Sequence, residues 1–140
     1  MVLHQKLYGP IFTLALALTL FVPVTAIVAQ DSMSAADMQV LLSGNTMSGK
    51  NEKGQDFHTY FDARGTMSGL GLRKYRDVGT WEITSEDKYC RQWSKWDKGT
   101  RECFHMFSLG NNFYRIKGTK SNFESLFIIQ KGDPENLIRN

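Results

Sequence analysis

The stretch GTWEITSEDKYCRQWSKWDKGTRECFHMF, residues 79–107, decides the fold of this chain. It holds both cysteines, Cys90 and Cys103, and all three tryptophans. Large apolar residues alternate with polar ones in short runs between polar turns, which is the pattern of antiparallel strands with one buried face. We expect three consecutive strands here: Thr80 to Thr84, Tyr89 to Ser94 and Thr100 to Phe107.

The N-terminus predicts export. A weakly basic start is followed by the uncharged apolar run IFTLALALTLFV (residues 11–22), and then by Pro23 and small residues. This order is typical of a secretory signal peptide, which we place at residues 1–29 with cleavage after Ala26 or Ala29. An uncleaved membrane anchor is the alternative, but Pro23 interrupts a run that only just approaches the length needed to span a bilayer. We therefore expect a periplasmic or secreted protein, without stable membrane insertion after cleavage.

The two cysteines predict a structural disulfide. An even, minimal cysteine count in an exported chain favours a disulfide over a metal site or a nucleophile. Closing a loop of this size restricts the unfolded chain by about 3 kcal/mol in the entropy model. If Cys90 faces Cys103, the flanking residues also pair across the strands: Arg91 with Glu102, and Tyr89 with Phe104. The opposite charges in the first of these pairs support the register.

The rest of the mature chain is expected to form one domain, residues 30–131, followed by a polar tail at residues 132–140 that Leu137 and Ile138 would dock. The chain of 140 residues has a net charge of +3, and loss of Lys6 with the signal leaves 16 basic against 14 acidic residues, or +2. A charge this small, with both signs interleaved, does not favour binding to nucleic acid. We expect no nucleic-acid partner.

One helix and about eight strands are predicted. Ser34 to Leu42 is the helix, since Ser34 and Asp37 form a capping-box pattern and Gly44 is placed to end it. The strands outside the opening stretch are Thr46 to Ser48, Phe57 to Phe61, Thr66 to Leu72, Phe113 to Lys117 and Phe123 to Gln130. Gly69 and Gly71 suggest a bend or bulge, and Arg73 to Val78 a basic connector. Short strands with regular turns indicate an all-β, antiparallel up-and-down barrel, lipocalin-like, with one short N-terminal helix.

The large apolar residues of the strands are the expected core or cavity lining. They are Phe57, Phe61, Trp81, Tyr89, Trp93, Phe104 and Phe127. An eight-stranded barrel can be filled by its own side chains or can hold one small ligand, and the sequence leaves both open. Trp96 lies in the hairpin loop between Lys95 and Asp97, where it either contacts a partner or a sugar, together with Lys95 and Lys98, or folds over the mouth of the barrel.

Residues with catalytic or metal-binding chemistry are sparse. After signal cleavage only His58 and His105 remain, 47 positions apart and without the spacing of metal ligands. There is no GxSxG motif, and the glycine-rich pieces lack the setting that phosphate binding needs. We predict no catalytic residue, no metal and no cofactor.

Several motifs together carry a resemblance to a known family. They are Ser43-Gly44-Asn45-Thr46 after the short helix, Gly79-Thr80-Trp81, and Cys90-x-x-Trp93 before Cys103. In this pattern the chain resembles a family of small secreted alphaproteobacterial proteins described as a domain of unknown function. The resemblance implies a periplasmic or secreted location; it transfers no catalytic residue to this chain, because none is established for the family. Gly-Thr-Trp is also similar to the Gly-x-Trp of lipocalins, although that motif opens their barrel and here lies mid-chain.

Two functions from different classes follow as hypotheses. The first is a non-enzymatic periplasmic binding or interaction module for a small apolar ligand or a protein partner. The second is an inhibitor or envelope-stress protein, similar to the small periplasmic lysozyme inhibitors, that acts through the loop from Lys95 to Lys98. A clustering of His58, His105 and a carboxylate in one cleft would instead indicate an enzyme.

Overall fold

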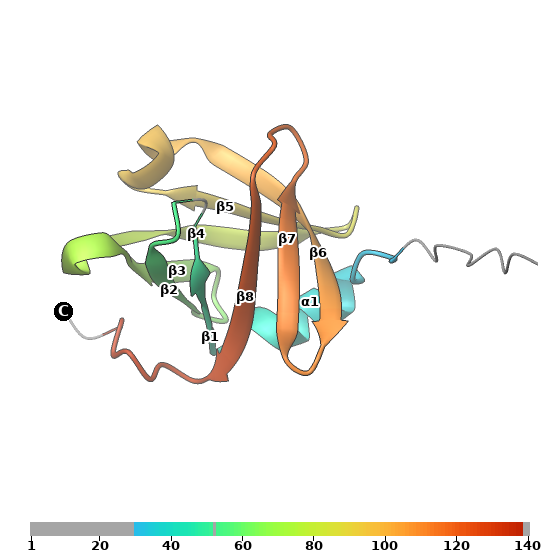
Figure 1. Cartoon of the computed structure of the whole chain (residues 1–140), viewed down its shortest axis with the longest axis horizontal. Helices are drawn as coiled ribbons and strands as arrows, with labels where there is room; N and C mark the ends of the chain where they lie inside the picture. The colour runs from blue at the N-terminus through green and yellow to red at the C-terminus, as the bar shows by residue number, and fades with distance from the viewer. Residues whose placement is uncertain (1–29, 52, 139–140) are drawn as a thin grey trace, which may run out of the picture.

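The protein is a closed eight-stranded antiparallel barrel with one short helix, as the sequence predicts (Figure 1). The computed structural model describes residues 30–51 and 53–138, so the predicted signal peptide lies outside the described part of the chain. The elements are α1 (Ala35–Leu42), β1 (Asn45–Lys50), β2 (Asp56–Phe61), β3 (Thr66–Leu70), η1 (Leu72–Lys74), β4 (Arg76–Thr84), β5 (Lys88–Trp93), η2 (Trp96–Gly99), β6 (Arg101–Gly110), β7 (Phe113–Gly118) and β8 (Glu124–Lys131).

Each strand pairs with the next along the chain, and the first strand pairs with the last. The β1–β8 ladder runs from Asn45, opposite Lys131, to Gly49, opposite Phe127. Closure matters because it leaves no strand with a free row of backbone hydrogen-bonding groups. Among the described residues, no helix is long and apolar enough to cross a membrane.

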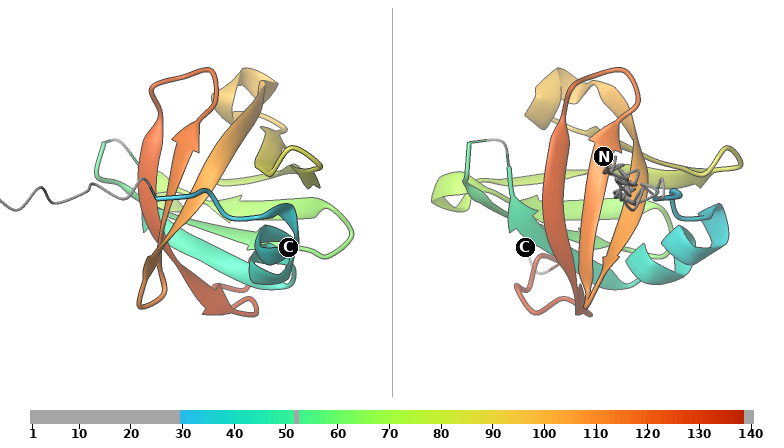
Figure 2. Two further views of the ribbon diagram at one scale, coloured as in Figure 1. Left: turned by 90° about the vertical axis from the view of Figure 1, so that its right-hand side faces the viewer. Right: turned by 45° about the vertical axis from the view of Figure 1, so that its right-hand side comes forward.

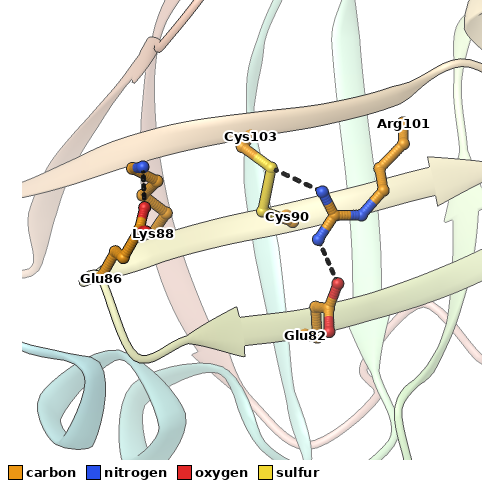
Figure 3. Close-up of a disulfide and its surroundings, with 6 residues drawn as sticks. All are labelled: Glu82, Glu86, Lys88, Cys90, Arg101 and Cys103. Carbon is orange, nitrogen blue, oxygen red and sulfur yellow. Dashed lines mark hydrogen bonds and ion pairs between the residues drawn. A yellow bond between two sulfur atoms is a disulfide. The ribbon is translucent and has the colours of Figure 1, made fainter.

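The disulfide and its predicted register are confirmed. Cys90 and Cys103 are bonded and lie directly opposite each other on β5 and β6. Arg91 faces Glu102, as the alignment of the cysteines requires. The disulfide lies on the outer face, where the guanidinium of Arg101 donates to the sulfur of Cys103 and also contacts Glu82 on β4 (Figure 3).

Inward-facing apolar side chains pack together in one half of the barrel. The buried core holds six of the seven predicted core residues, and Phe57 is half-buried at the other end. Aromatic rings pack edge to face there. The ring centres of Phe61 and Trp81, for example, lie 5.3 Å apart in an edge-to-face arrangement. Residues of this half that are at most 2 % exposed are Met38, Leu42, Met47, Phe61, Met67, Tyr89, Phe104, Met106, Ile116 and Phe127.

Helix α1 closes the filled end. It lies across the end of the barrel opposite η2 (Figures 1 and 2). Met38 and Leu42, one turn apart, are fully buried in the core, because residues i and i+4 share one face of a helix. The predicted cap is present: the hydroxyl of Ser34 accepts from the backbone N–H of Asp37. Gly44 then adopts a left-handed φ of 72°, which costs glycine little.

The segment between β3 and β4 differs from its prediction. Residues 73–78 are not one connector, because β4 already begins at Arg76 and includes Asp77 and Val78. The bend or bulge predicted at Gly69 and Gly71 is not at Gly69, which pairs regularly with Thr59 and Asp77, whereas Gly71 lies between the end of β3 at Leu70 and the start of η1. The irregularity of the sheet lies between Ser108 and Gly110, opposite β7.

Residues 132–138 pack on the barrel. Leu137 is 4 % exposed, whereas Ile138 is exposed. The carboxylate of Asp133 accepts from the backbone N–H groups of both residues, and Arg76 donates to the carbonyl of Asn136. The docking predicted for Leu137 is therefore present.

Tyr89, deep in the filled half, generates a prediction about alkaline stability. Burial raises the pKa of the Tyr89 hydroxyl to about 12 from an ordinary 10.0, and Arg91 only partly offsets this. The folded state therefore retains a proton that the unfolded chain releases. The contribution of this proton to the free energy of unfolding is fully present below pH 10 and is lost as the pH rises through about 12. Two pKa units correspond to about 3 kcal/mol.

We expect an ultraviolet titration to show one tyrosine that ionises only near this higher pH or with unfolding. Tyr89→Phe keeps the ring and removes the titration, so its urea midpoint should fall less steeply than that of the wild type as the pH rises above 10. The assignment is wrong if every tyrosine ionises together while the barrel is folded.

Candidate functional site

The end of the barrel opposite α1 is open. Here the β1–β2 loop, η1, η2 and the β7–β8 loop surround a cavity of about 510 Å³, and Figure 1 shows η1 and η2 at this end. We call it the mouth cavity. Its aromatic lining is Phe57, Tyr75, Trp93, Trp96 and Phe123, and its other lining residues are Asn51, Lys53, Gln55, Asp56, Thr59, Gly71, Arg91 and Asp97.

An ion pair inside the barrel separates the mouth cavity from the filled half. Arg91 Nη2 lies 3.2 Å from a carboxylate oxygen of Glu102 on the adjacent strand and 3.4 Å from one of Asp97 on η2. The Arg91 side chain is only 12 % exposed. The carboxylate of Glu102 is 30 % exposed, so removing it would leave the largely buried charge of Arg91 without its nearest partner. This pair therefore fixes the floor of the cavity.

Aromatic rings hold the Arg91 guanidinium in place. Its central carbon lies 4.9 Å from the ring centre of Phe104, 5.7 Å from that of Phe123 and 6.0 Å from that of Trp93. Such contacts favour a cation over the negative face of a ring. Nε of Arg91 is buried and has no hydrogen-bond partner among the described residues.

Trp96 folds toward the mouth and packs on Trp93. The two ring centres are 4.7 Å apart, and Trp96 is half-buried. Gly69 makes room for them, since a Cβ atom there would lie 2.5 Å from the Trp93 ring and 2.6 Å from that of Trp96. Of the two placements that the sequence left open, the structure has Trp96 over the mouth. It places Lys95 and Lys98 on the exposed side of the same loop.

A buried carboxylate anchors this loop. Asp77 is 5 % exposed, and its Oδ2 accepts from the backbone N–H groups of Lys95 and Trp96, each at 2.8 Å. Its Oδ1 accepts from the N–H of Val78 at 2.9 Å. Burial raises the pKa of Asp77, but the three hydrogen bonds favour the charged form more strongly, so its pKa lies below the ordinary value.

Sequence reasoning missed Asp77 as a site residue. The sequence did contain a pattern that places Asp77 on the inward face. Asp77, Gly79 and Trp81 are every second residue of this strand, and alternate residues of a strand point to the same face. An acidic residue on an apolar inner face needs hydrogen-bond donors. Residues 73–78 were expected to form a connector rather than part of a strand, so the inward placement of Asp77 was not predicted.

The two histidines lie apart on the barrel wall. His58 on β2 contacts the hydroxyl of Ser48 at 2.8 Å and lies 3.9 Å from Glu135. His105 is on β6, which is not adjacent to β2, and its Nδ1 is buried without a partner in the described chain. The clustering that would indicate an enzyme is not formed by these two residues. No group of three or more metal-ligating side chains occurs within the described ranges.

The sequence matches neither a protein-family model nor a curated protein. The site must therefore be interpreted from its own chemistry.

The anchoring role of Asp77 generates a second prediction. Asp77→Asn keeps the size of the side chain but turns an amide NH₂ group toward backbone donors. We expect the unfolding free energy to fall by about 1–3 kcal/mol at neutral pH, with a red shift of tryptophan emission as Trp96 is released. The pKa of Asp77 is lower in the folded state than in the unfolded chain. Its contribution to the free energy of unfolding is therefore present above the ordinary carboxyl pKa and is lost as the pH falls through the pKa of the folded state. The difference between wild type and variant should therefore shrink in acid.

A matched control is Glu86→Gln, which neutralises a carboxylate in an exposed turn pair with Lys88. Urea unfolding monitored by fluorescence should show little change for this variant. Equal stability of Asp77→Asn and the wild type would contradict the anchoring role.

Proposed function

We propose that this protein is an exported, non-enzymatic binding module that holds a small ligand with an apolar face in its mouth cavity. One observation carries the proposal: the barrel is filled at the α1 end and hollow at the other. A barrel needed only for stability would be packed throughout. Ligand cavities typically measure about 300–1,000 Å³ and combine aromatic walls with a few polar groups, as this one does.

The wall of the cavity is held in place before any ligand arrives. Asp77 fixes the loop that carries Trp96, and the pair of Arg91 with Glu102 fixes the floor. A cavity that is already formed spares a ligand the cost of ordering its site. The proposal includes no catalytic step.

A periplasmic or secreted location is part of the proposal. It is supported by the predicted signal peptide at residues 1–29 and by the disulfide between Cys90 and Cys103, a bond that persists in oxidising compartments. The resemblance to small secreted alphaproteobacterial proteins agrees with it.

The alternative is an inhibitor that acts through the loop from Lys95 to Lys98. Its support is that this loop is anchored by Asp77 while both lysines stay exposed. The inward turn of Trp96 weakens it, because the aromatic anchor of such a contact is half-buried against Trp93. Loss of lysozyme activity on addition of this protein, and its recovery with Lys98→Ala, would favour the inhibitor.

The binding proposal predicts saturable uptake of a neutral apolar probe. N-phenyl-1-naphthylamine should bind with one-to-one stoichiometry and fluoresce more strongly in the cavity. Gly71→Leu should weaken binding by about tenfold or more, because the new side chain fills the mouth. The backbone tolerates it, since a Cβ atom at this position lies at ordinary contact distance, 3.5 Å, from Trp96.

Val78→Leu is the matched control, since Val78 is 58 % exposed and not part of the cavity lining. It should bind the probe like the wild type. Equal affinity of Gly71→Leu and the wild type for the probe would overturn the proposal, and so would a wild type that binds neither this probe nor a neutral sugar.

A further inference from the structure

The class of ligand can be inferred from the charges, hydrogen-bonding groups and rings of the mouth cavity. This inference rests on the proposed function and makes it more specific. Among the described residues, the charged side chains lining the cavity and their ion-pair partners balance: Lys50, Lys53 and Arg91 against Asp56, Asp97 and Glu102. Glu102 lies beneath, paired with Arg91. An anionic ligand would meet these carboxylates, and a cationic one would meet Arg91, whose charge is already shared between two carboxylates. The balance favours a neutral ligand.

The hydrogen-bonding groups require a ligand that both donates and accepts. Asp97 is 43 % exposed and has only a long 3.4 Å contact with Arg91, so its carboxylate can still accept hydrogen bonds. Arg91 lines the cavity, and its guanidinium has more N–H donors than the two contacts of Nη2 use, although Nε itself is buried. A purely apolar ligand would cover Asp97 and Arg91 and leave their free hydrogen-bonding positions unsatisfied, at a cost of about 1–3 kcal/mol for each group. A ligand hydroxyl can donate to Asp97 or accept from Arg91.

The rings offer flat surfaces next to these polar groups. Trp96 packs on Trp93 above the floor, and Tyr75 on the rim is 67 % exposed. The negative face of an aromatic ring attracts partially positive C–H groups. A pyranose ring presents such C–H groups on its faces and hydroxyls around its edge. We infer that the mouth cavity binds a neutral saccharide, with the sugar ring against Trp96 and hydroxyls on Asp97 and Arg91.

The test is a calorimetric titration with four trisaccharides at millimolar concentration. Three are neutral: cellotriose, maltotriose and chitotriose with all three amines acetylated. The fourth, trigalacturonate, has similar size and carries negative charge. We expect at least one neutral sugar to bind, trigalacturonate to bind at least about tenfold more weakly, and Trp96→Ala to weaken the neutral sugar by about tenfold or more.

Two further variants keep the result interpretable if Trp96→Ala is unstable. Lys98→Ala, on the outer side of the same loop, should bind the sugar like the wild type. Asp97→Asn keeps the side-chain shape at a left-handed φ of 52° that asparagine tolerates, and it retains an oxygen acceptor. It should weaken binding of the neutral sugar by about threefold or more, because an amide oxygen is a weaker acceptor than a carboxylate, and it should narrow the gap in affinity to trigalacturonate, because it removes a negative charge.

The outcomes separate this inference from the proposed function. If N-phenyl-1-naphthylamine binds in the mouth and no neutral trisaccharide does, the saccharide assignment is wrong and the binding module stands. If neither binds, both are wrong. Binding of trigalacturonate as tight as that of the neutral sugars would overturn the argument from charge balance, and sugar binding unaffected by Trp96→Ala in a folded variant would place the sugar elsewhere.

Discussion

A charged pair inside the barrel, Arg91 with Glu102, determines how the rest of the molecule is arranged. The pair sits one step along the strands from the disulfide, so the covalent bond on the outer face fixes the charges on the inner face. Two ionised groups can stay in a barrel only where partners and some water remain. The aromatic rings around Arg91 and the carboxylate of Asp97 supply those partners. The barrel is therefore packed with apolar side chains on one side of the pair and open on the other.

The two ends of the barrel serve different purposes. At the packed end α1 inserts Met38 and Leu42 into the core, and burial of the Tyr89 hydroxyl raises its pKa to about 12. At the open end polar groups do the positioning. Asp77 accepts three backbone hydrogen bonds and holds the loop of Trp96, while Gly69 leaves space for the paired indoles. Under the proposed function, the packed half supplies most of the buried apolar core and the open half holds the ligand.

Much of the fold could be predicted from residues 79–107. Alternation along the strands indicated which side chains point inward, and pairing of the cysteines fixed the facing residues, including Arg91 with Glu102. Both kinds of information are local. The alternation of side chains along a strand and the pairing of two nearby cysteines can be recognised without knowing how distant segments fold. Barrel closure by β1 and β8 followed from the need to remove exposed edges.

The site was harder to predict, because it depends on contacts between loops. The direction of Trp96 is set by Asp77, 19 positions earlier, and by the absence of a side chain at Gly69. A loop tryptophan can turn outward or inward with the same local sequence, so pattern alone left both open. Whether the barrel was hollow depended in the same way on how many of its aromatic residues reach the α1 end. The likeness to the alphaproteobacterial family stays a prediction.

The most direct test of the central claim, that a ligand occupies the mouth above the Arg91–Glu102 pair, is a nuclear magnetic resonance titration of the three tryptophan indole N–H signals. Trp93 and Trp96 line the cavity, whereas the indole of Trp81 donates to the carbonyl of Asp62 near the packed end. On addition of a sugar that binds or of N-phenyl-1-naphthylamine, we expect the signals of Trp93 and Trp96 to shift together and that of Trp81 to stay in place. A shift of the Trp81 signal without those of Trp93 and Trp96 would contradict it.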